Sequence, residues 1–134
     1  MSKDLADGSL LEALPLKVRP LVEALMREPL VPPDELRREL KSHEQQVDRA
    51  AATRGDLDVN LAECIGTSCL VLLNTLGPDT PEESRRLIQV ACRYFVETED
   101  REGDLASVFG FDDDAEVLNA VAVKLGRPDL VVSI

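Results

Sequence analysis

The stretch 56-DLDVNLAECIGTSCLVLLNTL-76 decides the fold, and Gly77 and Pro78 follow it directly. Asp56 is suited to cap a helix at its start, and the glycine–proline pair stops the helix at its end. A helix of this size has about twenty residues and a length of about 30 Å. Its second half is apolar or small on nearly every side. We therefore expect residues 65–73 to be the most buried element, in the middle of a helical bundle.

The chain before this stretch also has helical patterns. Residues 33–53 carry an apolar stripe that contains one histidine, with spacings of four, three, four and three: Leu36, Leu40, His43, Val47 and Ala50. Prolines at positions 15, 20, 29, 32 and 33 divide the region before it. We expect a flexible tail at 1–8, a short helical turn at 9–14 and a short helix at 20–28.

Two further helices are expected after it. Residues 80–83, Thr-Pro-Glu-Glu, combine a cap, a first-turn proline and a glutamate at the third position, which favours a helix start. A last helix, capped by Asp112 or Asp113, should end at residues 126–128, Gly-Arg-Pro. The predicted fold is an all-α, irregular single-domain helical bundle over residues 1–134, with two short N-terminal helices and four longer helices.

Composition supports this fold and excludes several functions. Aromatic residues make up 3% of the 134 residues, so the core must consist of Leu, Val and Ala, which suits helices better than sheets. A formal net charge of −11 argues against nucleic-acid binding. No apolar run approaches the ~20 residues of a membrane span, and residues 1–9 lack a signal-peptide pattern. Three cysteines form no disulfide framework, so we expect a reduced, cytoplasmic protein.

Residues 97–116, which we call the acidic corner, hold most of the negative charge. Nine carboxylates and one base, Arg101, give −8 out of the total of −11. Four apolar residues are interleaved with the acids: Leu105, Val108, Phe109 and Phe111. A purely solvated tail would lack them, so we expect a folded segment rather than a disordered one.

Part of this region has a recognisable pattern. Residues 94–118 read YFVETEDREGDLASVFGFDDDAEVL. Their spacing resembles the signature of the YkvA-like family, a small bacterial domain of unknown function. The matching positions are Tyr94, Asp100, Asp104, Gly110, Asp113, Asp114, Val117 and Leu118. Thr98 and Gly103 stand where the family has prolines. The loop is apolar in members of the family, which makes them look membrane-associated, whereas here it is acidic. The resemblance implies a helix–loop–helix over residues 81–125 and no settled activity.

Two interpretations of the acids stay open. Carboxylates from a bent loop suit a hard cation, so Ca²⁺ or Mg²⁺ is a candidate cofactor. The candidate ligands are Asp100, Asp104, Asp113 and Asp114. An EF-hand does not fit, because Leu105 and Phe111 stand where such a loop needs Gly and Glu. The structural alternative is that these acids cap the last helix and hold the loop through backbone N–H groups.

Catalytic chemistry finds little support in the residues. His43 could pair with Cys64, Cys69 or Cys92 as base and nucleophile, but its position on the apolar stripe favours a buried structural histidine. No phosphate loop, serine elbow or zinc spacing is present. We therefore expect a protein that is not an enzyme.

The favoured function is a non-enzymatic adaptor that binds a protein partner with a basic surface. Its candidate partner-binding residues are Glu99, Asp100, Glu102 and Asp104. The alternative is a small helical protein that binds or is stabilised by Ca²⁺ or Mg²⁺, and a homo-oligomer also stays open. The apolar C-terminus, residues 130–134, either adds to a partner's sheet or, as we expect, packs against the bundle.

Overall fold

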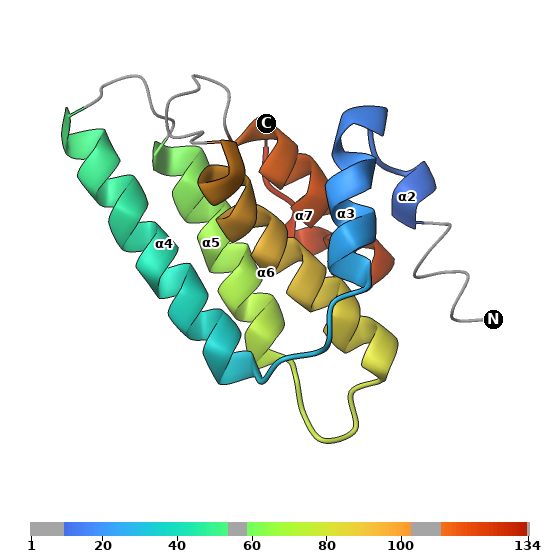
Figure 1. Ribbon diagram of the computed structural model, residues 1–134. Coiled ribbons are helices and arrows are strands. Elements are labelled where there is room, and N and C mark those ends of the chain that lie inside the picture. The colour runs from blue at the N-terminus through green and yellow to red at the C-terminus, as the bar shows by residue number, and fades with distance from the viewer. Residues whose placement is uncertain (1–9, 54–58, 103–110, 134) are drawn as a thin grey trace.

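The computed structural model describes residues 10–53, 59–102 and 111–133, and the side chains of the long helix at 82–102 as far as Glu97. Helices form the whole framework of these ranges (Figure 1). In chain order they are α2 (Leu10–Glu12), a 3₁₀ turn η2 (Leu16–Val18), α3 (Arg19–Met26), α4 (Pro33–Thr53), α5 (Val59–Asn74), α6 (Glu82–Glu102), α7 (Asp112–Lys124) and a 3₁₀ turn η4 (Pro128–Leu130). The described residues contain no strand, which confirms the all-α prediction.

The central helix is α6. It packs against α3, α4, α5 and α7, while α4 and α5 lie side by side (Figure 1). Its residues 87–92, together with Tyr94 and Phe95, are all buried. Because α6 touches four helices, it fixes the position of α4 and α5 relative to the rest of the bundle.

The expectation that α5 would occupy the middle of the bundle is wrong for one of its faces. Ile65 and Leu72 point inward and are at most 1% exposed. Cys64, Thr67 and Leu70 lie on the opposite side and are exposed, Leu70 by 40%. Small and weakly polar residues blur the periodicity of this helix, so its sequence does not reveal which side stays open.

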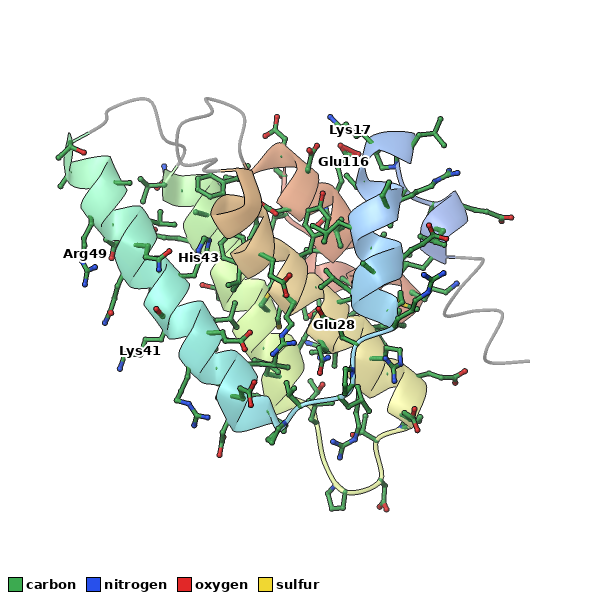
Figure 2. The ribbon with its side chains drawn as sticks, viewed as in Figure 1. Lys17, Glu28, Lys41, His43, Arg49 and Glu116 are labelled. Atoms are coloured by element: carbon green, nitrogen blue, oxygen red, sulfur yellow. The ribbon has the colours of Figure 1, made fainter. Side chains whose placement is uncertain are left out.

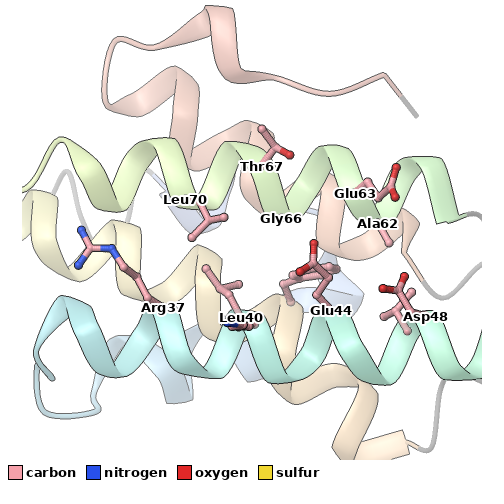
Figure 3. A pocket seen from close by; sticks show the side chains of 12 residues that line it. Arg37, Leu40, Glu44, Asp48, Ala62, Glu63, Gly66, Thr67 and Leu70 are labelled. Atoms are coloured by element: carbon pink, nitrogen blue, oxygen red, sulfur yellow. The ribbon is translucent and has the colours of Figure 1, made fainter.

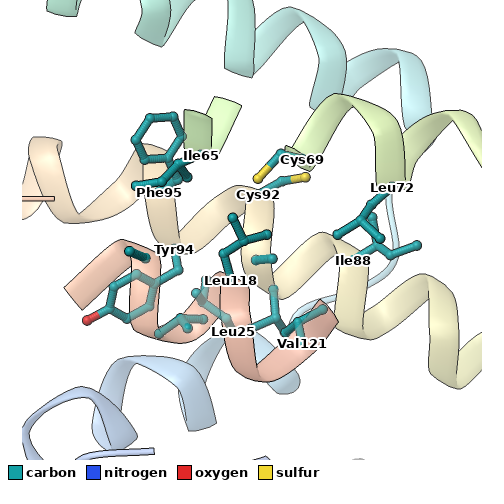
Figure 4. Close-up of a cluster of buried hydrophobic side chains, with 14 of the residues drawn as sticks. Leu25, Ile65, Cys69, Leu72, Ile88, Cys92, Tyr94, Phe95, Leu118 and Val121 are labelled. Atoms are coloured by element: carbon teal, nitrogen blue, oxygen red, sulfur yellow. The ribbon is translucent and has the colours of Figure 1, made fainter. Parts of the chain in front are cut away.

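The core is aliphatic, as the composition predicts. Figure 4 shows Leu25 of α3 near Leu118 and Val121 of α7, and Ile88 of α6 beside Leu72 of α5. The rings of Phe95 and Phe111 add an aromatic contact, with centroids 6.2 Å apart. Phe111 is 3% exposed, so the end of the acidic corner is anchored in the core.

Arg93 on α6 joins three parts of the chain through carboxylates. Its guanidinium donates to Glu28, two residues after the end of α3, and to Glu35 and Glu39 on α4, over N–O distances of 2.8–3.2 Å. The hydrogen bonds to Glu39 raise the pKa of Arg93 above its ordinary value, so the group stays charged. This cluster holds α4 against α6.

The start of α7 differs from the prediction. Its N-cap residue is Phe111, without a side-chain capping bond, so neither Asp112 nor Asp113 is the cap. Both lie in the first turn with Asp114, where negative charge still favours the positive end of the helix. The buried Phe111 ring sets where this helix begins, which outweighs the capping preference of aspartate.

The C-terminal residues pack against the bundle. The Asn119 side chain donates to the Val132 carbonyl at 2.9 Å and accepts from the Val132 N–H at 2.8 Å. Ser68 on α5 donates to the Leu130 carbonyl at 2.8 Å. The prediction of a packed tail is therefore confirmed for residues 130–132, whereas Ile134 lies outside the described residues.

Candidate functional site

The predicted partner-binding residues fall at the edge of the described structure. Glu99, Asp100 and Glu102 lie in the last turns of α6, and their side chains are outside the described part. Asp104 lies outside the described residues altogether. Their role as a docking surface stays a prediction.

The predicted metal ligands are only partly placed. Asp113 pairs with Lys17 of η2 at 3.0 Å, and Asp114 beside it is 2% exposed. Among the side chains that the structure describes, no group of three or more His, Cys, Asp or Glu could hold a metal ion. Because Asp100 and Asp104 are not among those side chains, the four-aspartate site stays a prediction.

His43 has the structural surroundings that its stripe position predicts. It is 1% exposed and points into the bundle from α4 (Figure 2). Its ring meets Phe95 edge-on, with centroids 4.5 Å apart. Cys69 and Cys92 are buried as well, and their mutual hydrogen bond together with burial raises the pKa of the Cys92 thiol well above its usual range. A thiol held neutral in this way is a poor nucleophile.

The structure reveals a groove that the sequence analysis did not identify. It runs between α4 and α5, has a volume of about 310 Å³ and is seen from close by in Figure 3. We call it the α4–α5 groove. Its lining residues are Arg37, Leu40, Lys41, Glu44, Val47, Asp48, Ala62, Glu63, Gly66, Thr67, Leu70 and Phe95.

The floor of the groove is apolar. Leu40 and Val47 come from α4 and Ala62 from α5, and all three are buried. Gly66 has no side chain to fill the groove, and a Cβ atom at this position would have Cε2 of Phe95 as its nearest neighbour, 3.9 Å away. A ligand side chain placed above Gly66 would therefore contact the Phe95 ring.

The rim of the groove carries charges that are separated along its length. Figure 3 shows Arg37 toward one end and Asp48 and Glu63 toward the other, with Glu44 between Arg37 and Asp48. Lys41 follows Arg37 by about one turn of α4. Within the described part of the chain, no ion pair engages any of these three carboxylates.

Arg37 differs from these acids, because it already has partners inside the protein. Its guanidinium pairs with Asp34 at 2.7 Å and donates to Asn74 Oδ1 at 3.0 Å. Among the described residues, the basic end of the groove is thus partly neutralised and the acidic end is not. The groove as a whole favours a ligand with positive charge.

The α4–α5 groove combines apolar and charged side chains. Its lining contains neither histidine nor cysteine. An apolar floor with a charged rim matches the grooves in which amphipathic helices are held. One wall of the groove has a signal in the sequence, since four charged residues of α4 border the buried stripe: Arg37, Lys41, Glu44 and Asp48. The other wall is the open face of α5, which has no such signal.

Comparison with known proteins identifies no relative of this chain. No helix in the described ranges is long and apolar enough to cross a membrane. No family model, curated protein or solved structure matches the chain. The resemblance of residues 94–118 to the YkvA-like family stays a prediction.

Proposed function

We propose that this chain is a non-enzymatic adaptor that holds an amphipathic helix of a basic protein partner in the α4–α5 groove. The observation that carries the proposal is the groove itself, an apolar floor bordered by three carboxylates without ion-pair partners in the described structure. The three free cysteines of the chain suit a reducing compartment, in keeping with a cytoplasmic protein.

Exposure of Leu70 supports a docking surface at this place. Large hydrophobic side chains are exposed at few positions in the described chain: Leu16, Leu70, Val123 and Val131. Leu70 is the one among them that lines the α4–α5 groove, whereas Val123 and Val131 line other hollows. Covering Leu70, which is 40% exposed, would remove apolar surface from water, and this drives association at about 25 cal/mol per Å² of surface.

Charge supports a basic partner rather than a nucleic acid or an acidic surface. The whole chain has a formal net charge of −11, and the end of the groove that has no ion pair in the described structure is acidic. Complementary charge speeds encounter and selects against acidic partners. Exposed pairs of this kind are screened over ~8–10 Å at ordinary ionic strength, so binding should weaken as salt increases.

The proposal can be tested with a synthetic peptide. The probe is a fluorescein-labelled helix of about three turns, with leucines three and four residues apart on one face and lysines elsewhere. Fluorescence anisotropy should show saturable binding to the wild-type protein. Gly66→Leu, which fills the centre of the groove, and Leu70→Ser should each weaken binding at least about tenfold, or about 1.4 kcal/mol.

Val123→Ser is the matched control for Leu70→Ser. Val123 is 61% exposed on α7 and does not line the groove, so this variant should bind as the wild type does. Circular dichroism would establish that every variant is folded. No saturable binding at about 1 mM protein, a concentration that corresponds to about −4 kcal/mol, would overturn the proposal. Equal binding by Gly66→Leu, Leu70→Ser and Val123→Ser would overturn it as well.

A further inference from the structure

The two walls of the α4–α5 groove run in opposite directions. Arg37, near the start of α4, donates to Asn74 at the end of α5, so these two helix ends lie together. At the other end Asp48 lies near Ala62 and Glu63, in the first half of α5 (Figure 3). The charge along the groove therefore changes from positive, near the start of α4 and the end of α5, to negative, near the end of α4 and the start of α5.

The length of the groove limits its occupant. On α4 the lining begins at Arg37 and ends at Asp48, eleven residues later. At 1.5 Å per residue this is about 17 Å, or three turns of helix. A helix of about twelve residues covers it from end to end.

We infer, on the basis of the proposed function, that the bound helix runs antiparallel to α4 and parallel to α5, with a basic N-terminal turn against Glu44, Asp48 and Glu63. A helix has partial positive charge at its N-terminus and partial negative charge at its C-terminus. In this direction the positive end meets the three carboxylates and the negative end meets Arg37 and Lys41. The opposite direction places both ends of the dipole against like charge.

The acidic end decides the direction more strongly than the basic end. Arg37 is already paired with Asp34 and bonded to Asn74, which weakens its pull on a ligand. Glu44, Asp48 and Glu63 have no ion pair in the described structure, so their charge is available to the ligand. The middle turn of the ligand places an apolar side chain over Gly66, next to Phe95.

Two peptides with the same composition test the direction. Each has about twelve residues, blocked ends, the same leucine face and the same hydrocarbon staple on the outward face, so that both are equally helical. One has two lysines in its first turn and two glutamates in its last, and the other has the reverse order. The lysines of the second peptide reach the acidic end of the groove only if its C-terminus lies there. The negative end of its helix dipole then faces the three carboxylates. The first should bind about fivefold more tightly at low salt.

A nitroxide at the N-terminus of the first peptide locates that end directly. Amide NMR signals of residues 44–48 and 62–63 should broaden, and those of residues 37–41 and 70–74 should not. Glu44→Gln, Asp48→Asn and Glu63→Gln combined should abolish the preference between the peptides. The same number and types of change at the exposed residues Glu12, Glu23 and Asp79, outside the groove, should preserve it.

The outcomes separate the direction from the proposed function. Groove binding with equal affinity for the two peptides, or with broadening at residues 37–41, would overturn the direction and leave the adaptor function standing. Loss of the preference in the Glu12, Glu23 and Asp79 control would also overturn it, since net charge alone would then be responsible. Absence of binding by both peptides would overturn the proposed function and the direction together.

Discussion

Replacement of Arg93 by methionine should destabilise the whole bundle, because one guanidinium connects α6 both to α4 and to Glu28 in the segment that follows α3. Arg93 donates four hydrogen bonds to three carboxylates: two to Glu39, one to Glu28 and one to Glu35. Methionine keeps the apolar stem of the side chain and removes the charge. The variant therefore leaves three glutamates close together without their common partner.

The magnitude follows from how much water reaches the cluster. The Arg93 side chain is 16% exposed, and those of Glu28, Glu35 and Glu39 are 29–41% exposed. Exposed ion pairs contribute ~0.2–1 kcal/mol each, and breaking a fully buried pair costs ~3–5 kcal/mol. The cluster lies between these limits, so Arg93→Met should lower the free energy of unfolding by about 1–3 kcal/mol. Arg93→Lys should lose part of that amount, because a point charge cannot reach three carboxylates in the same way.

Urea denaturation followed by circular dichroism measures this change. Arg38→Met is the matched control, since Arg38 lies on the exposed side of α4, and it should stay within about 0.5 kcal/mol of the wild type. Added salt should reduce the difference between Arg93→Met and the wild type, because the cluster is partly hydrated. A loss below about 0.5 kcal/mol for Arg93→Met, equal to that of the control, would refute the view that this cluster holds α4 in place.

Three further outcomes are expected. Leu72→Ala, at a side chain that is 1% exposed, should cost ~2–5 kcal/mol in urea denaturation, and a cost below about 0.5 kcal/mol would mean that α5 is peripheral. Gly66→Ala should raise stability by ~0.5–1 kcal/mol, because its Cβ would make an ordinary 3.9 Å contact with Phe95, and a lower melting temperature would contradict this. Ca²⁺ or Mg²⁺ should leave the melting temperature of the wild type unchanged, whereas a saturable increase that Asp113→Asn abolishes would favour the metal-binding alternative.

The helices and their faces could be predicted from the sequence because local signals agree there. Leu36, Leu40, His43 and Val47 recur at helical spacing, and all four are buried on α4. The start predicted at residues 80–83 lies where α6 begins, at Glu82. Such patterns record which side of a helix faces the core, so they suffice for the fold class.

The α4–α5 groove could not be predicted in the same way. It depends on which face of α5 is left uncovered, and this is decided by how α6 packs against four other helices. Because residues 66–68 are small, α5 has no clear polar face in its sequence. The pattern therefore does not predict that Leu70 is exposed. The cap of α7 differs from the predicted one for a related reason, because burial of Phe111 is a tertiary effect that outweighs local propensity.

The most direct test of the central claim is an amide NMR titration of the full chain with the leucine–lysine peptide. We predict that the largest saturable shift changes fall on residues 37–48 and 62–70, the two walls of the α4–α5 groove. The acidic corner, residues 97–116, serves as the internal comparison, because it has the higher density of carboxylates. Shift changes that concentrate in the acidic corner, or that do not saturate, would contradict the claim that the groove is the binding site.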